Sequence, residues 1–113
     1  MQPSKQPAPS SPAALTGKQR RYLRALAHDK KPVVQIGHQG LTGSVLDAVD
    51  AALVTHELIK VRVQKECPDE VSDLAPIIEE KTRSSVAQTI GKTLVIYRRR
   101  VNDPKIVLPK DPS

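Results

Sequence analysis

The sequence predicts an α/β fold with the element order α-β-α-β-α-β-β and a four-stranded mixed sheet. Three observations support this prediction. Apolar residues recur at helical spacing in three segments, short runs rich in β-branched residues follow each segment, and a glycine-lysine pair separates the last two runs. A length of 113 residues predicts a single domain.

The first helix is expected over residues 17–27. Thr16 and Gln19 have the spacing of a capping box, which starts a helix, and Pro32 disfavours a helical residue before it. Apolar and basic side chains separate onto opposite faces of this helix. The apolar face holds Leu15, Tyr22, Leu23 and Leu26, and the basic face holds Arg20, Arg21 and Arg24, with Lys18 at its flank.

Residues 33–63 predict a β-α-β unit. A first strand is expected over residues 33–36, Thr42 predicts the N-cap of a helix over residues 43–55, and a second strand is expected over residues 58–63. In that second strand Lys60 and Arg62 alternate with apolar residues, which is typical of one covered and one solvated face. Two strands that are connected by a helix usually lie parallel in the same sheet, so the strands over residues 33–36 and 58–63 are expected to be parallel.

The last third of the chain predicts a helix and a hairpin. The helix is expected from Ser72 or Asp73 to Lys81, which places Pro76 in the first turn, where a proline costs little. Strands are expected over residues 86–90 and 93–98. Gly91-Lys92 between them predicts a two-residue turn with glycine first, which is typical of type II′.

Both ends of the chain differ in composition from the region between them. Residues 1–14 contain four prolines and no apolar periodicity, so this leader is expected to be disordered and not to act as a signal peptide. Residues 15–100 are expected to form the domain. Residues 101–113 contain three prolines and are expected to form an extended tail, in which Val107 and its neighbours are a candidate edge segment.

Basic residues gather near the two ends of the expected domain. Residues 1–36 carry a net charge of +6, residues 37–90 carry −4 and residues 91–100 carry +4. A segregated basic surface favours a polyanionic partner, with ordinary solubilising charge as the alternative. Cys67 is the only cysteine, which fits a reducing compartment, and the scattered histidines argue against a zinc site.

Gly37-His38-Gln39-Gly40 falls between the first strand and the second helix. Glycine allows a sharp turn and the close approach of another molecule. The amides around Gly40 to Ser44 are expected to face outward with the positive end of the helix dipole, which favours a phosphate. A GxxG loop that clamps a nucleic-acid backbone is the recognition device of KH-type RNA-binding domains. A tight turn without a ligand is the alternative.

Several separate motifs follow one another across residues 15–99: Leu15-Thr16-Gly17-Lys18-Gln19, Lys31-Pro32-Val33-Val34, and residues 37–42, 56–61 and 90–98. Together they resemble the YhbY family, the bacterial stand-alone form of the CRM (chloroplast RNA splicing and ribosome maturation) domain. The resemblance implies a fold similar to the C-terminal domain of translation initiation factor three, with a KH-like GxxG loop. It also implies RNA binding and, for single-domain bacterial members, association with rRNA in precursors of the large ribosomal subunit.

We therefore expect a surface that contacts the phosphate backbone of RNA. Such contacts position RNA but carry little sequence information. Tyr22 and Tyr97 are the only aromatic residues, and both are expected to pack rather than to stack on bases. The loop contributes Gly37, His38, Gln39, Gly40 and Thr42, and the flanking basic residues are Lys18, Arg20, Arg21, Arg24, Lys92, Arg98 and Arg99.

These features favour a non-enzymatic, cytoplasmic RNA-binding protein, and the resemblance to the YhbY family implies that it acts in assembly of the large ribosomal subunit. It is expected to be a monomer and to need no cofactor, metal ion or membrane. The sequence has no Cys-His or Ser-His-Asp arrangement and no Rossmann or Walker glycine pattern. A protein-interaction adaptor that uses the acidic second and third helices, with GxxG as a simple turn, is the alternative.

Overall fold

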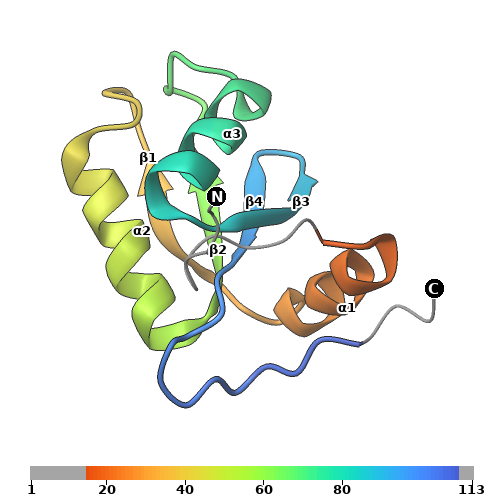
Figure 1. Cartoon of the computed structure of the whole chain (residues 1–113). Helices are drawn as coiled ribbons and strands as arrows, with labels where there is room; N and C mark the ends of the chain where they lie inside the picture. The colour runs from red at the N-terminus through yellow and green to blue at the C-terminus, as the bar shows by residue number, and fades with distance from the viewer. Residues whose placement is uncertain (1–14, 110–113) are drawn as a thin grey trace, which may run out of the picture.

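The computed structural model describes residues 15–109; the expected leader over residues 1–14 lies outside the described residues. Three helices and four strands follow in the predicted order (Figure 1). No helix in the described part of the chain is long and apolar enough to cross a bilayer. The elements are α1 Gly17–Ala27, β1 Pro32–Ile36, α2 Gly43–His56, β2 Leu58–Val63, α3 Val71–Thr82, β3 Ser85–Ile90 and β4 Thr93–Tyr97.

The four strands form one mixed sheet in the order β1-β2-β4-β3, which confirms the predicted fold class. β1 pairs with β2 in parallel, and β4 pairs antiparallel with both β2 and β3. The last strand therefore lies inside the sheet. Because β4 runs opposite to β1 and β2, it begins at the edge where they end: Thr93 lies opposite Arg62, and Tyr97 lies opposite Leu58.

Helices cover both faces of the sheet, with α2 and α3 on one face and α1 on the other (Figure 1). Alternation along the strands divides the core in two. In β4, Leu94 and Ile96 pack toward α2 and α3, whereas Val95 and Tyr97 pack toward Leu23 of α1. Burial of these apolar side chains is the main driving force for the fold.

The helix starts follow the predicted capping residues. Thr16 and Gln19 form the expected capping box, in which the Thr16 hydroxyl accepts from the Gln19 amide at 3.1 Å. The Thr42 hydroxyl accepts from the Val45 amide at 3.2 Å. The start of α3 was predicted too late, because the carbonyl of Glu70 already accepts from the third and fourth helical amides. Pro76 consequently lies in the second turn of α3.

The two tyrosines differ in burial. Tyr97 is 5 % exposed, which confirms that it packs in the core. Tyr22 is 39 % exposed, so the prediction that it packs is wrong. The face of α1 that meets the sheet is centred on Leu23 and Ala27, both of which are fully buried, and this rotation leaves Tyr22 and Leu26 at the margin.

A buried carboxylate fixes the segment after β4. Glu57 is 1 % exposed, and its φ of 62° turns the chain from α2 into β2. Its two carboxylate oxygens accept from the backbone amides of Arg100 (3.0 Å), Lys105 (2.7 Å) and Ile106 (3.0 Å). Up to residue 109 the segment forms no helix or strand, and it packs Ile106 and Leu108 against the α1 core. No strand forms around Val107, because the amides of Lys105 and Ile106 donate to Glu57 and are not available for strand pairing.

Replacing Glu57 with glutamine should lower the free energy of unfolding by about 2 kcal/mol, the usual scale for hydrogen bonds to a buried charged group. The glutamine side chain would keep one acceptor oxygen, but its NH2 group, a donor, would face a backbone N–H that now donates to the carboxylate. Urea denaturation measures the difference. Glu66→Gln, at an exposed position, is the matched control and should change stability by less than about 0.5 kcal/mol. Equal stability of the two variants would show that the carboxylate does not hold the tail.

Candidate nucleic-acid interface

The GxxG segment forms a tight turn between β1 and α2. The Gly40 amide donates to the Gly37 carbonyl at 2.9 Å, and Gly40 has a φ of +71°. Its N–H is therefore not available to a ligand, which corrects the expectation that the Gly40 amide contacts phosphate. His38 and Gln39 are exposed at the tip of the turn. The turn therefore exposes the side chains of His38 and Gln39, whereas Gly40 is buried.

Both glycines fit closely against the loop after β2. A Cβ atom at Gly37 would lie 3.0 Å from Oε1 of Gln64, and a Cβ atom at Gly40 would lie 3.0 Å from Oδ2 of Asp69. Close packing and the positive φ together explain why glycine is required at position 40. The Gln64 amide also donates to the Ile36 carbonyl at 2.8 Å, which ties the two loops together.

The first turn of α2 presents free backbone donors beside this turn. The Thr42 hydroxyl accepts a hydrogen bond from the Val45 amide, and the Thr42 carbonyl accepts one from the Leu46 amide. The amides of Gly43 and Ser44 have no hydrogen-bond partner among residues 15–109, and both residues are exposed. The helix dipole adds partial positive charge at this position. Two free amides at the start of a 14-residue helix form a place where an anion can bind.

Lys92 lies at the same edge of the sheet. Its carbonyl accepts from the Val63 amide at 2.7 Å, just before Gln64 contacts the strand that leads to Gly37. Gly91 has a φ of +59°, and Lys92 is not among the residues with positive φ, as a type II′ turn requires. The exposed Lys92 side chain thus shares an edge with the GxxG turn.

The sheet itself contributes two cations that the sequence analysis did not include in the site. Lys60 and Arg62 of β2 alternate with residues buried under α2 and α3, so they lie on the opposite face. Nζ of Lys60 donates to the His28 carbonyl at the end of α1, at 3.2 Å. Next to Arg62 in the sheet, the Gln35 side chain accepts from the Gln64 side chain. The Lys-Arg alternation was the available signal for this surface.

The basic residues of α1 have different roles. Nη1 of Arg20 donates to the carbonyls of Val86 (2.8 Å) and Ala87 (3.1 Å), so this arginine stabilises the contact of α1 with β3. Lys18, Arg21 and Arg24 are exposed. Arg20, Arg24 and His28 share one flank of the helix because they are four residues apart. That flank runs from β3 to Lys60 of β2.

The tail occupies the other flank of α1. The Gln19 side chain donates to the Pro109 carbonyl at 3.1 Å, and Figure 1 shows the tail passing below α1 with the β3–β4 hairpin above it. The tail leaves β4 at the end of the sheet opposite to the GxxG turn. Arg24 lies on the flank of α1 away from the tail. On the face of the sheet that α1 covers, Val33, Gln35 and Arg62 of β1 and β2 remain exposed, so this half of the sheet is uncovered and leads to the loop.

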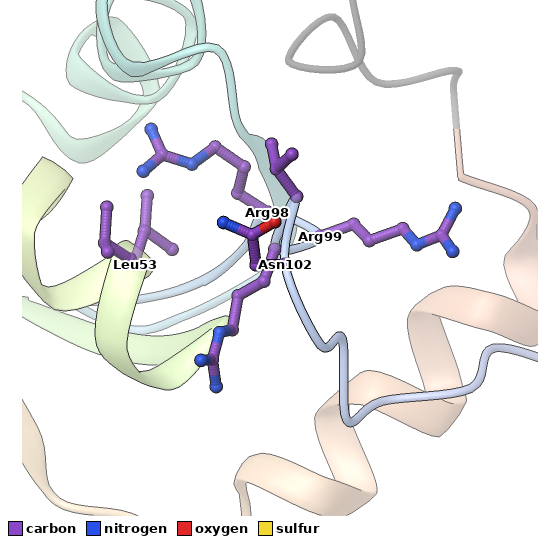
Figure 2. Close-up of a pocket in the computed structure, with 7 residues that line it drawn as sticks. Leu53, Arg98, Arg99 and Asn102 are labelled. Carbon is purple, nitrogen blue, oxygen red and sulfur yellow. The ribbon is translucent and has the colours of Figure 1, made fainter.

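The arginines after β4 do not join this surface. β4 spans five residues, which separates Arg98 from the GxxG edge by about 16 Å. Nη1 of Arg98 donates to Oδ1 of Asp50 (2.6 Å) and to the Thr82 carbonyl (2.8 Å). Figure 2 shows Arg98 and Arg99 leaving the chain in opposite directions. Arg98 is thus part of the fold, and Arg99 lies far from the loop.

Tyr97 offers no platform for a base. Its side chain lies in the core, where burial raises the pKa of the phenol above its ordinary value, and the negative charge of Glu57 adds to this effect while Arg99 opposes it. The described residues contain no group of three or more His, Cys, Asp or Glu side chains that could hold a metal ion.

Comparison with known proteins identifies the family. The model of the CRS1 / YhbY (CRM) domain matches residues 15–98. The chain belongs to this family. The CRM match covers the three helices and the four strands of the sheet, from the capping box of α1 to Arg98.

Individual relatives of this CRM protein agree along almost their whole length. It is 39 % identical over 95 residues to Probable RNA-binding protein YqeI of Bacillus subtilis, covering 84 % of this chain and 99 % of that protein. It is 41 % identical over 96 residues to a Haemophilus influenzae protein named RNA-binding protein, covering 85 % and 96 %. The solution structure of a hypothetical Staphylococcus aureus protein matches with a TM-score of 0.73 and 44 % identity, covering 85 % of this chain and 100 % of that chain.

Two glycine substitutions near the loop should have opposite effects on stability. Gly40→Ala should lower the free energy of unfolding by about 1–2 kcal/mol, because the residue must keep a positive φ and its Cβ meets Asp69. Gly43→Ala should raise it by about 0.5 kcal/mol, because its Cβ meets no atom within 4 Å and alanine favours the helix. Thermal unfolding measures both, and a Gly40→Ala protein as stable as the Gly43→Ala protein would contradict this description of the turn.

Proposed function

We propose that this CRM protein binds RNA by its phosphate backbone, at the edge of the sheet that carries the GxxG turn. One observation supports the proposal most strongly: the free amides of Gly43 and Ser44 lie beside an exposed turn, next to lysine and arginine side chains that form no ion pair among residues 15–109. Relatives of similar length are named RNA-binding proteins. A phosphate at the start of α2 would be bound by main-chain donors, which requires no particular base.

The cations around the turn extend the proposed contact. Lys92 lies beside the turn, and Arg62 follows on the uncovered half of the sheet. Next along β2, Lys60 donates one of its three ammonium protons to the His28 carbonyl and keeps two for a ligand. Arg21 and Arg24 continue the surface onto α1, with Lys18 at its far end. Each phosphate neutralised by these side chains releases counterions, so affinity should fall steeply with salt. Arg20 and Arg98 are excluded because they stabilise the fold, and Arg99 because it lies at the other end of the sheet.

The finer proposal is that the RNA is rRNA in precursors of the large ribosomal subunit, bound by a monomer in the cytoplasm. The resemblance to single-domain YhbY proteins supports it. Apart from His38, the loop and the uncovered half of the sheet present no exposed aromatic residue among residues 15–109. Recognition would then depend on RNA shape. The acidic side chains of α2 and α3, on the opposite face, remain the surface that an adaptor would use instead.

Placing two aspartates at the tip of the turn, as His38→Asp with Gln39→Asp, should weaken binding of a large-subunit rRNA transcript about tenfold or more. Each carboxylate would face a phosphate, and a repulsion of about 1 kcal/mol per pair is expected in water. Filter binding at several salt concentrations measures the change. Both side chains are exposed, so the fold should remain intact.

The matched control is His38→Asn with Gln39→Asn, which alters the same side chains without adding charge. It should bind within about threefold of the original protein, because the proposed contacts are made by the main chain. Unchanged binding by the aspartate variant would remove the turn from the interface, and absence of binding at low salt would favour the adaptor. Crosslinking in cells, followed by sequencing of the attached RNA, tests the ribosomal partner: large-subunit precursors should be enriched.

A further inference from the structure

A pocket of about 340 Å³ lies at the end of the sheet opposite to the GxxG turn. Leu53 and Val54 of α2 form one wall, and the chain from Arg98 to Asn102 forms the other (Figure 2). Gly43 and Val54 are 11 residues apart on α2, so the pocket lies about 16 Å along the helix from the free amides. Nothing in the proposed RNA contact uses this pocket.

Apolar surface is uncovered on both walls. Leu53 is fully buried and forms the floor, whereas Val54 is 58 % exposed and Val101 is 75 % exposed. Contact between these two exposed valines and an apolar side chain of another molecule would be favourable, because it removes apolar surface from water. A phosphate would gain nothing from them.

The pocket also carries positive charge at Arg100, whereas the charge of Arg98 is offset by its ion pair with Asp50. Arg98 is held in place by Asp50 and by the Thr82 carbonyl, and Figure 2 shows its side chain on the same side of the chain as Leu53. The amide of Arg100 is fixed by Glu57, but no ion pair involves its guanidinium among residues 15–109. An arginine with a fixed backbone and a free guanidinium is well placed to bind a carboxylate.

Two features argue against a continuation of RNA into this pocket. Asp47 is exposed on α2 between the free amides at its start and the pocket at its end, and its carboxylate would repel a phosphate chain that followed the helix. The pocket lining also has no aromatic residue on which a base could stack. An apolar floor with a cationic rim instead matches a peptide that combines apolar and acidic side chains.

We infer that this pocket binds a segment of a partner protein that combines acidic side chains with leucine or similar apolar side chains, while RNA occupies the other end of the molecule. A fluorescein-labelled peptide of alternating glutamate and leucine is the probe. It should bind in fluorescence polarisation, and peptides of alternating glutamate and serine or lysine and leucine should bind about tenfold more weakly. In NMR spectra, the methyl groups of Leu53, Val54 and Val101 should shift with the glutamate-leucine peptide.

Val54→Ser and Arg100→Gln should each weaken this peptide at least about threefold without changing affinity for the rRNA transcript. Ile77→Ser and Lys81→Gln, at exposed positions of α3, are the matched controls and should bind the peptide normally. Equal binding of the glutamate-serine peptide, or methyl shifts elsewhere, would overturn the inference. If the transcript displaces the peptide, and Arg100→Gln weakens the affinity for the transcript as much as the affinity for the peptide, the pocket belongs to the RNA-binding surface. This result would leave the test of the loop unaffected.

Discussion

The antiparallel position of β4 between β2 and β3 is the constraint on which the rest of the molecule depends. It brings the β3–β4 turn with Lys92 to the edge where β1 and β2 end, beside the GxxG turn. It also sends the arginines after β4 to the opposite edge. One pairing therefore separates the basic residues into a group that can share a ligand with the loop and a group that cannot.

Basic residues that look equivalent in the sequence have different roles in the structure. Arg20 binds carbonyls of β3 and Arg98 binds Asp50 and Thr82, so both act between elements of the fold. Arg21 and Arg24 are exposed on α1. Because a guanidinium that satisfies internal carbonyls is not free to bind a phosphate without breaking those bonds, the net charge of the chain overstates the charge available to RNA.

Local signals made most of the fold predictable from the sequence. The capping box at Thr16, the cap at Thr42 and the alternation in β2 each depend on residues within one or two turns, and each was confirmed. Strand order and the partners of Arg98 were not predictable, because Asp50 is 48 residues away in the chain. Glu57 was missed for the same reason: its partners lie in the tail, and a lone glutamate at a helix end carries no sign of burial.

The most direct test of the account is NMR mapping of the backbone amides as a large-subunit rRNA hairpin is added. The account predicts that the largest shifts occur at Gly43, Ser44 and Lys92, with further shifts at Arg21 and Arg24. The amides from Arg99 to Asn102 should not move. Shifts centred on Arg99 to Asn102, with the first turn of α2 unchanged, would contradict it.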